Sequence, residues 1–279
     1  MNVLDDIRIE MHSHTDCSDG VVTPEELVGL AAAKGLTHLA ITDHDTFAAL
    51  DRARAVLPSG MRLIPGVEIS AAAGERDVHV LGYFLDEHNA ALNAEIARCS
   101  RSRDERSAKM ADNLAADGYH VSAAILAERG LTPNRSNIAR LLVEAGDLEN
   151  TDVAFATVLN RKSKYYVPRR DVEVHLAVRL IKDAGGIAVV AHPRHYHVVD
   201  VIDELIPDGL DGVECFHSEQ TVEDEEFLVP FARERGLLVT GGSDFHGDSV
   251  HPSVLAGNMP SQEDIRVFLD AGRARGFEV

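Results

Sequence analysis

Two histidines separated by a single residue lie near the start of the chain. His12 and His14 belong to the segment MHSHTDCSDG, which follows a short apolar run. Side chains at i and i+2 of an extended chain point to the same side, so both imidazoles can bind one divalent metal ion. Asp19 follows in a turn that ends at Gly20 and can bring a carboxylate to the same region. Alone, the spacing is equally compatible with two ordinary polar histidines.

Side chains that bind metals also follow, or lie within, other apolar runs. They are His44, Glu68, His79, His192, Asp244 and His246. Asp244 and His246 repeat the i, i+2 spacing of the first pair. Because the carboxyl ends of parallel strands meet on one side of an open sheet or a barrel, we expect all these side chains to form one site. Ligand-type residues at so many strand ends favour a metal centre over a structural explanation.

The expected donor set mixes imidazoles with carboxylates. Such a set suits manganese, zinc or iron, and we expect two or three divalent ions, with manganese first and zinc or iron as alternatives. The cysteines, Cys17, Cys99 and Cys215, have neither paired nor zinc-type spacing. A carboxylate that bridges two ions would lower the pKa of a bound water molecule and supply hydroxide near pH 7.

The apolar runs alternate with helical stretches. Expected strands cover residues 7–11, 39–42, 63–67, 77–81, 187–191, 210–215 and 237–240. Expected helices cover residues 24–34, 47–56, 172–184 and 219–235. Thr23, Pro24 and the acids that follow form a helix start, with a hydroxyl cap and proline at the first helical position. The alternation predicts an α/β fold with a parallel sheet.

The strand signal disappears between about residue 86 and residue 160. The segment RCSRSRDERSAKMADNLAADG reads as a long polar helix, and shorter helical pieces follow it. We therefore expect a first barrel segment at 1–85, a small inserted helical subdomain at 86–160, and a second barrel segment at 161–279. Most charges of the insertion are expected to serve solubility.

The composition limits the partners and the location. A net charge of −19 would repel a polyanion such as duplex DNA, unless cations were concentrated locally or metals offset the carboxylates. The low aromatic content offers no evident platform for stacked bases. The chain begins without a basic leader followed by an apolar run, and no segment is long enough to span a membrane. We expect a cytoplasmic protein without a membrane partner.

Five motifs together resemble those of the polymerase and histidinol phosphatase (PHP) family. They are MHSHTDCSDG, TDHD, GVEIS, AHP and GGSDFHG, in the family's order and on both barrel segments. The resemblance implies a distorted (β/α)7 barrel with a trinuclear metal centre. It implies one ion bound by His12, His14, Glu68 and Asp244, a second by Glu68, His79 and His192, and a third by Asp19, His44 and His246, with Glu68 bridging the first two.

The helical insertion makes the chain most similar to a nucleotide phosphatase group within that family. Its members remove the 3′-phosphate of 3′,5′-nucleoside bisphosphates, such as adenosine 3′,5′-bisphosphate, or trim short RNA from the 5′ end. The family's Arg-x-His-x-Ala-Arg segment corresponds to residues 135–140, with Asn137 in place of the histidine, and Tyr165 stands where a family turn usually has glycine. The candidate substrate-binding residues are Arg135, Asn137, Lys164, Arg169 and Arg194.

We expect a phosphatase for this small nucleotide substrate in which metal-bound hydroxide attacks phosphorus in line. Asp244 could orient the water, and His217 could protonate the leaving oxygen or only order the residues around the ions. Three alternatives remain open: a 5′-to-3′ exoribonuclease on short RNA, a histidinol-phosphate phosphatase, and a non-enzymatic metal-binding regulator.

Overall fold

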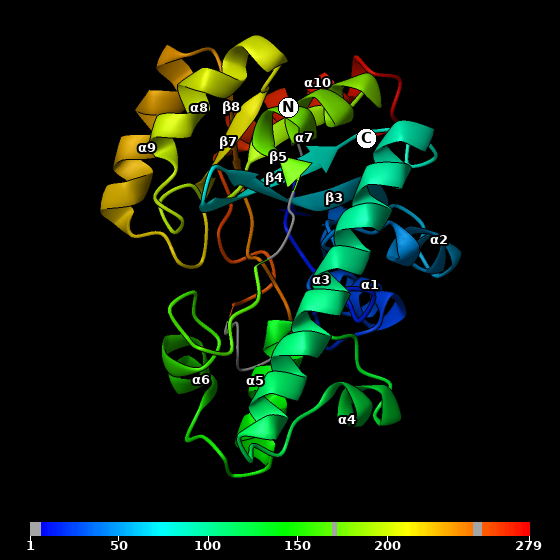
Figure 1. Ribbon diagram of the computed structural model, residues 1–279. Coiled ribbons are helices and arrows are strands. Elements are labelled where there is room, and N and C mark those ends of the chain that lie inside the picture. Colours follow the sequence, from blue (N-terminus) through cyan, green and yellow to red (C-terminus); the bar gives the residue numbers. More distant parts are fainter. Residues whose placement is uncertain (1–6, 169–171, 248–252) are drawn as a thin grey trace. The chain divides into compact units, whose positions relative to one another are not determined.

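The computed structural model describes residues 7–168, 172–247 and 253–279, drawn as a ribbon in Figure 1. The described chain forms two compact units. The first holds residues 7–96, 172–247 and 253–279, and the second holds residues 97–168. Residues 86–96, which the sequence assigns to the insertion, belong to the first unit, where Leu92 and Ile96 are buried. Residues 161–168, assigned to the second barrel segment, belong to the second unit.

Eight described strands form one curled sheet in the first unit. They are β1 (Ile9–Glu10), β2 (His38–Ile41), β3 (Arg62–Ala73), β4 (Arg76–Tyr83), β5 (Val172–Glu173), β6 (Ile187–Val190), β7 (Gly212–Phe216) and β8 (Leu238–Gly241). Their order is β1-β2-β3-β4-β6-β7-β8, with β5 beside β3. The pairs are parallel except those of β4, which is antiparallel to both β3 and β6. Beyond the two end strands, Ser13 and Phe245 form a parallel bridge that brings the edges of the sheet together.

Strand β3 is longer than the sequence predicts. The expected strand ended at Val67, with Glu68 directly after it, but β3 continues to Ala73 and pairs with β4 in a hairpin. The expected strand end is therefore wrong, because hydrogen bonds to β4 satisfy the backbone beyond the carboxylate. Ser70 lies opposite His79 in this hairpin. Glu68 and His79 thus lie within antiparallel strands, not at the carboxyl ends of parallel ones.

The helices of the first unit follow the strands. Helix α1 (Pro24–Ala33) begins with the predicted cap, in which Thr23 and Glu26 exchange side-chain and backbone hydrogen bonds. The other helices are α2 (Ala48–Ala55), α7 (Val174–Asp183), α8 (Val199–Leu205), α9 (Val222–Glu234) and α10 (Gln262–Arg273), with a 3-10 turn at Ile206–Asp208. The helices predicted at 24–34, 47–56 and 219–235 are confirmed. The helix predicted from 172 starts at 174, because residues 172–173 pair with β3.

The core of the first unit is mainly aliphatic and fixes the strands that lead to the site. Leu39, Ile41 and Ile64 from β2 and β3 are fully buried, and Tyr83 and Phe268 add the largest side chains. Burying one such side chain stabilises the fold by about 1.5–3 kcal/mol. These side chains form two apolar clusters, one with Leu39 and Ile41 and one with Ile64, Tyr83 and Phe268, which hold the strands in place.

The second unit is helical within its described residues. Most of α3 (Ala90–Ala116) belongs to it, together with α4 (Ala123–Glu128), α5 (Arg135–Glu144) and α6 (Thr151–Thr157). Side chains of Ser122, Asn134 and Asn150 cap the three short helices by accepting backbone N–H groups. A separate apolar core includes Leu114 and Ile138. Across the described ranges, none of the helices combines the length and the hydropathy that a membrane span requires.

Candidate metal centre

Four side chains from β3 and from the segments after β1 and β8 converge in the first unit. His12 Nε2 lies 3.3 Å from Glu68 Oε2 and 3.3 Å from Asp244 Oδ1. His14 Nε2 lies 3.2 Å and 3.0 Å from the same two oxygens. Donor atoms that surround one ion at about 2.1 Å are about 3.0–3.4 Å apart. The spacing of these four atoms fits a shared divalent cation.

These converging atoms are buried, yet they do not pair with one another as hydrogen-bond partners. His12 and His14 are fully buried, and within the described chain neither Nε2 atom nor Asp244 Oδ1 makes a hydrogen bond. Leaving a buried polar atom without a partner costs about 1–3 kcal/mol. Native proteins contain few such atoms, so several at one point indicate a missing ligand. Lone pairs aimed at one point suit a cation.

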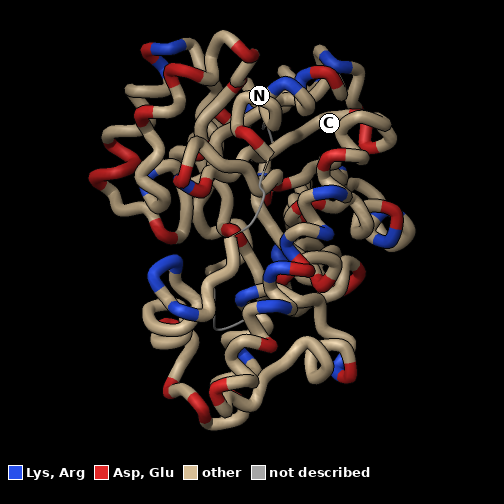
Figure 2. Tube along the Cα trace, viewed as in Figure 1, with Lys and Arg blue, Asp and Glu red and all other residues tan. Residues whose placement is uncertain are grey.

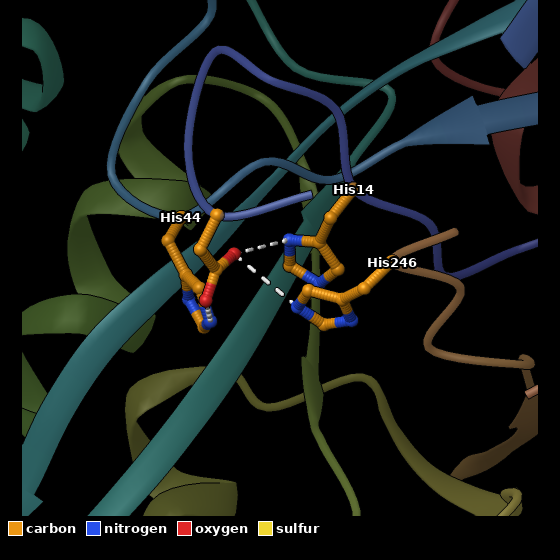
Figure 3. Close-up of side chains that lie close together, drawn as sticks. His14, His44 and His246 are labelled. Atoms are coloured by element: carbon orange, nitrogen blue, oxygen red, sulfur yellow. Dashed lines mark ion pairs between the residues drawn. The ribbon is translucent and has the colours of Figure 1, made fainter. Parts of the chain in front are cut away.

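A second group surrounds Asp19. His246 Nε2 lies 3.2 Å from Asp19 Oδ1, and His14 Nδ1 lies 3.8 Å from the same oxygen. His44 Nε2 lies 4.0 Å from Asp19 Oδ2. Figure 3 shows His14 and His246 side by side, with stacked rings whose centroids are 4.2 Å apart. The structure thus brings the third predicted ligand set together and adds His14 to it.

The Glu68 carboxylate contacts histidines through both of its oxygens. Its Oε1 lies 2.8 Å from His79 Nδ1 and 3.0 Å from His192 Nε2. Its Oε2 faces the first group and lies 3.1 Å from His44 Nδ1. Such a carboxylate can bridge two cations. The second predicted set, Glu68, His79 and His192, is less compact. Glu68 and His79 group with His44, whereas His192 groups with His217 and Asp244.

Burial and neighbouring charges set the protonation of this cluster. Burial alone would raise the pKa of Glu68, but the His44 ring and its neighbours hold that pKa well below its usual value. Burial alone would lower the pKa of His14, but the Asp244 and Glu68 carboxylates raise it to about 10. Both shifts show that the acidic and basic groups of the cluster stabilise one another's charged forms. A bound cation would compete with protons for the histidine nitrogens.

The backbone around the ligand segments is tight and locally strained. A side chain at Gly242 would place its Cβ 2.2 Å from the Cβ of His12, so only glycine fits there. His192 has φ +28° and Asp244 has φ +50°, in the left-handed region that costs a non-glycine residue about 1–3 kcal/mol. Strain of this kind concentrates at functional sites and persists where the surroundings impose it.

Three buried carboxylates that the sequence does not single out as functional hold the ligand segments. Asp43 accepts hydrogen bonds from the backbone and hydroxyl groups of Thr15 and from the Ser18 hydroxyl, and so orders the loop that carries Asp19. Glu10 in β1 and Glu214 in β7 are fully buried. In the sequence, the only sign of Glu10 and Glu214 is that each is a single acid inside an apolar strand.

His217 is oriented differently from the candidate ligands. Its Nδ1 accepts the backbone N–H of Glu219 over 3.1 Å, so the neutral ring carries its proton on Nε2. That Nε2 lies 3.4 Å from Asp244 Oδ2. Burial would lower the pKa of His217, but Asp244 and Glu214 raise it above its usual value. The ring therefore presents an N–H donor to the cluster.

The predicted substrate-binding residues lie in both units, and several already have partners. Arg194, in the first unit, pairs with Asp224 over 2.6 Å. In the second unit, Asn137 is buried; its amide donates to the Thr132 carbonyl and accepts from Arg140. The other contacts are Lys164 with Asp117, Tyr165 with Asp117 through its hydroxyl, and the Arg135 guanidinium with the Phe155 ring, 5.9 Å from its centroid. Arg169 lies outside the described residues.

The fold and the ligand clusters define a PHP-like α/β phosphoesterase. The family model for the PHP domain matches residues 10–155, and the chain belongs to this family. A crystal structure described as a candidate metal-dependent phosphoesterase from Bifidobacterium adolescentis superposes with a TM-score of 0.86 at 34% identity and covers 97% of both chains. The predicted family and fold class are confirmed.

Two curated relatives name activities. A 5′-3′ exoribonuclease of Haemophilus influenzae is 34% identical over 248 residues, which cover 86% of this chain and 90% of the relative. A 3′,5′-nucleoside bisphosphate phosphatase of Chromobacterium violaceum is 32% identical over 248 residues, with 86% and 87% covered. Both activities cleave phosphoric esters. The chain is therefore a hydrolase of phosphoric esters, with His, Asp and Glu clusters able to bind metal.

Proposed function

We propose that the chain is a metal-dependent phosphatase that removes the 3′-phosphate from 3′,5′-nucleoside bisphosphates. The observation that carries the proposal is the Glu68 carboxylate, whose two oxygens face two different sets of histidines. The proposed ligands are the nine predicted residues, namely His12, His14, Asp19, His44, Glu68, His79, His192, Asp244 and His246. We propose two or three divalent ions, with manganese first and zinc or iron as alternatives.

Divalent ions bound there would polarise the phosphoryl oxygens and lower the pKa of the attacking water molecule. Asp244 has one oxygen toward His14 and the other toward His217, a position from which a carboxylate can orient that water. His217 directs its Nε2–H toward the same place and can give a proton to the leaving oxygen. His14 and His217 are both buried, so their surroundings strengthen electrostatic interactions with the reacting groups.

The substrate class is supported by charge as well as by similarity. Residues 97–171 contain 13 Lys and Arg against 10 Asp and Glu, whereas the rest of the chain contains 14 against 36. Figure 2 shows this contrast along the chain. A basic segment in an otherwise acidic protein favours a substrate with phosphate beyond the one that is cleaved. We propose that Arg135, which has no carboxylate partner among the described residues, contacts that second phosphate.

An exoribonuclease acting on short RNA is the second candidate. The Haemophilus influenzae relative favours it, and a basic segment would also suit a short strand. The two functions share their chemistry but differ in the product that leaves. A phosphatase releases inorganic phosphate, whereas an exoribonuclease releases nucleotides from the 5′ end.

A panel of three substrates tests the proposal. Purified protein supplied with Mn²⁺ is assayed with adenosine 3′,5′-bisphosphate, a short 5′-phosphorylated RNA and histidinol phosphate, and phosphate and nucleotides are both measured. We expect the highest kcat/KM for the bisphosphate, with AMP and phosphate formed in equal amounts. A higher kcat/KM for the RNA or for histidinol phosphate would replace the proposed function with the corresponding alternative. Failure of all three substrates to react would contradict it.

A further inference from the structure

The Glu214 side chain joins two segments that carry proposed ligands. Glu214 lies in β7 and is fully buried. Its Oε1 lies 2.9 Å from His12 Nδ1, and its Oε2 accepts the backbone N–H of His192 over 2.8 Å. His12 follows β1 and His192 follows β6, so one carboxylate on a third strand contacts both segments.

The contact with His12 decides which ring nitrogen carries the proton. An ionised carboxylate only accepts hydrogen bonds, so His12 donates its Nδ1–H to Glu214. The Nε2 lone pair then points toward Glu68 and Asp244, each with an oxygen 3.3 Å away. A carboxylate behind a ligand imidazole also makes the ring more basic and fixes its orientation. Glu214 therefore prepares His12 to bind a cation.

The contact with His192 holds a strained backbone. His192 has φ +28°, which a residue with a side chain rarely adopts. The hydrogen bond from its N–H to Glu214 opposes relaxation of this segment. In the strained conformation the ring reaches Glu68, with Nε2 3.0 Å from Oε1. The same carboxylate thus places a second proposed ligand.

We infer that Glu214 is a positioning residue that holds His12 and His192 in metal-binding geometry and so couples the two sides of the Glu68 carboxylate. The inference rests on the proposed metal centre. Glu214 also lies near His12 and His217 in a group that could hold an ion itself. However, each of its oxygens already contacts a segment that carries a proposed ligand, His12 or His192. The role that fits these contacts is to act through His12 and His192.

The substitution Glu214→Gln tests the inference because it keeps the side chain's size. The glutamine oxygen can still accept the His192 N–H, but its NH₂ group then faces His12 Nδ1. The ring must accept there and carry its proton on Nε2, which blocks the ligand nitrogen. We expect Mn²⁺ affinity, measured by competition with a chelator, to fall about 10- to 100-fold. In ¹⁵N NMR spectra of the metal-free proteins, we expect His12 Nδ1 to carry a proton in the wild type and none in the variant.

Asp211→Asn is the matched control. Asp211 directly precedes β7 and accepts the backbone N–H of Ala188 over 2.8 Å as well as a bond from Lys182. Both variants thus replace a carboxylate that accepts a backbone N–H from β6 or from the segment after it, but only Glu214 contacts proposed ligands. We expect Asp211→Asn to lower the free energy of unfolding and to leave Mn²⁺ affinity unchanged.

Two outcomes would overturn the inference: wild-type Mn²⁺ affinity in Glu214→Gln, or an equal loss of affinity in Asp211→Asn. Absence of Mn²⁺ binding in the wild-type protein would instead contradict the proposed metal centre itself, so the two failures are distinguishable.

Discussion

Each imidazole near the cluster offers two nitrogens, and the partner of one nitrogen decides what the other can do. His12 directs Nδ1 to Glu214 and His246 directs Nδ1 to the Asp244 carbonyl over 2.9 Å, which leaves Nε2 of each ring for the cluster. His217 accepts a backbone N–H at Nδ1 and so presents a proton on Nε2. The hydrogen bond at Nδ1 therefore distinguishes the candidate ligands His12 and His246 from the candidate proton donor His217.

His217→Gln tests the role of that proton. We expect kcat for a nucleotide bisphosphate to fall by about 10²- to 10⁴-fold, the usual contribution of a general acid. The loss should be much smaller for p-nitrophenyl phosphate, because p-nitrophenolate leaves without taking up a proton. Steady-state kinetics with both substrates, at equal metal content, measure the difference. An equal loss for both substrates would show that His217 only orders its neighbours.

His38, a residue of β2 that is not a proposed ligand, predicts a pH dependence of stability. Its ring is buried, and burial, together with Arg273 and Arg62, lowers its pKa from 6.5 to about 4. The unfolded chain therefore binds this proton at a higher pH than the folded chain. The stability that the neutral ring contributes is complete above pH 6.5 and is lost as the pH falls from 6.5 toward 4.

The wild-type protein should lose free energy of unfolding between pH 7.5 and pH 5. We expect this loss to be smaller in His38→Phe by on the order of 1 kcal/mol, after discounting for the partial exposure of His38. Urea unfolding of the metal-free protein at both pH values measures this difference. The substitution also removes the hydrogen bond between His38 and Thr37, but that cost is present at both pH values and cancels in the difference. His88→Gln, at an exposed ring, is the control and should behave as wild type. The same pH dependence in His38→Phe would refute the assignment.

The residue types near the site could be predicted from the sequence, but their supporting partners could not. His12, His14 and Asp244 are identified by spacing, because polar ligands at strand ends have few structural explanations. Glu10 and Glu214 escape notice because a strand residue's partners come from distant segments. Glu10 accepts bonds from Ser243 and Ala256, which no local pattern connects to it.

The two ends of the sheet are held together at the scale of elements. Glu10 in β1 accepts the N–H groups of Met11 and His12 on its own side. From the other side it accepts bonds from the N–H and hydroxyl of Ser243, which precedes Asp244, and from the N–H of Ala256. All of these groups donate, so an ionised carboxylate matches them and an amide does not.

We expect Glu10→Gln to lower the free energy of unfolding by about 2–4 kcal/mol, because the amide N–H groups would face buried donors. Glu173→Gln is the control, since Glu173 caps α7 at an exposed position and its loss should cost about 1 kcal/mol or less. Chemical denaturation of the two variants measures the difference. Equal losses would mean that the carboxylate's charge does not hold the two segments together.

Element boundaries show where local sequence patterns were sufficient. Helix α1 was predictable because its cap, Thr23 with Glu26, is local. The extension of β3 to Ala73 was not, because pairing with β4 decides it. The expectation that Glu68 lies at the end of its strand was wrong for the same reason, whereas His79 lies within a strand, as predicted. The sheet nevertheless brings both residues to the cluster.

At the scale of the whole molecule, charge divides the chain into an acidic part, which holds the ligand clusters, and a basic helical part. The sequence predicts a helical segment here, but the boundary at residue 97 depends on which residues pack together in three dimensions and is a tertiary property. The proposed substrate carries a second phosphate, and the basic part of the chain contains cations of the kind that bind phosphate.

Arg135→Ala tests this division of roles. We expect KM for a 3′,5′-bisphosphate to rise about tenfold or more, and KM for a 3′-monophosphate to change little, because a charge-assisted phosphate contact contributes about 1.5–3 kcal/mol. Arg129→Ala, at an exposed cation of the same unit that pairs with Glu144, is the control and should leave both values unchanged. Equal increases in KM for both substrates would refute the role of Arg135.

The central claim is that this cluster binds divalent ions and that phosphoester cleavage depends on them. Protein treated with a chelator is titrated with Mn²⁺, while bound metal per chain and phosphate release from adenosine 3′,5′-bisphosphate are measured together. We expect no turnover before metal is added, and recovery that rises with binding and reaches its limit at two or three ions per chain. Full turnover by the metal-free protein, or saturation of activity without bound metal, would contradict the account.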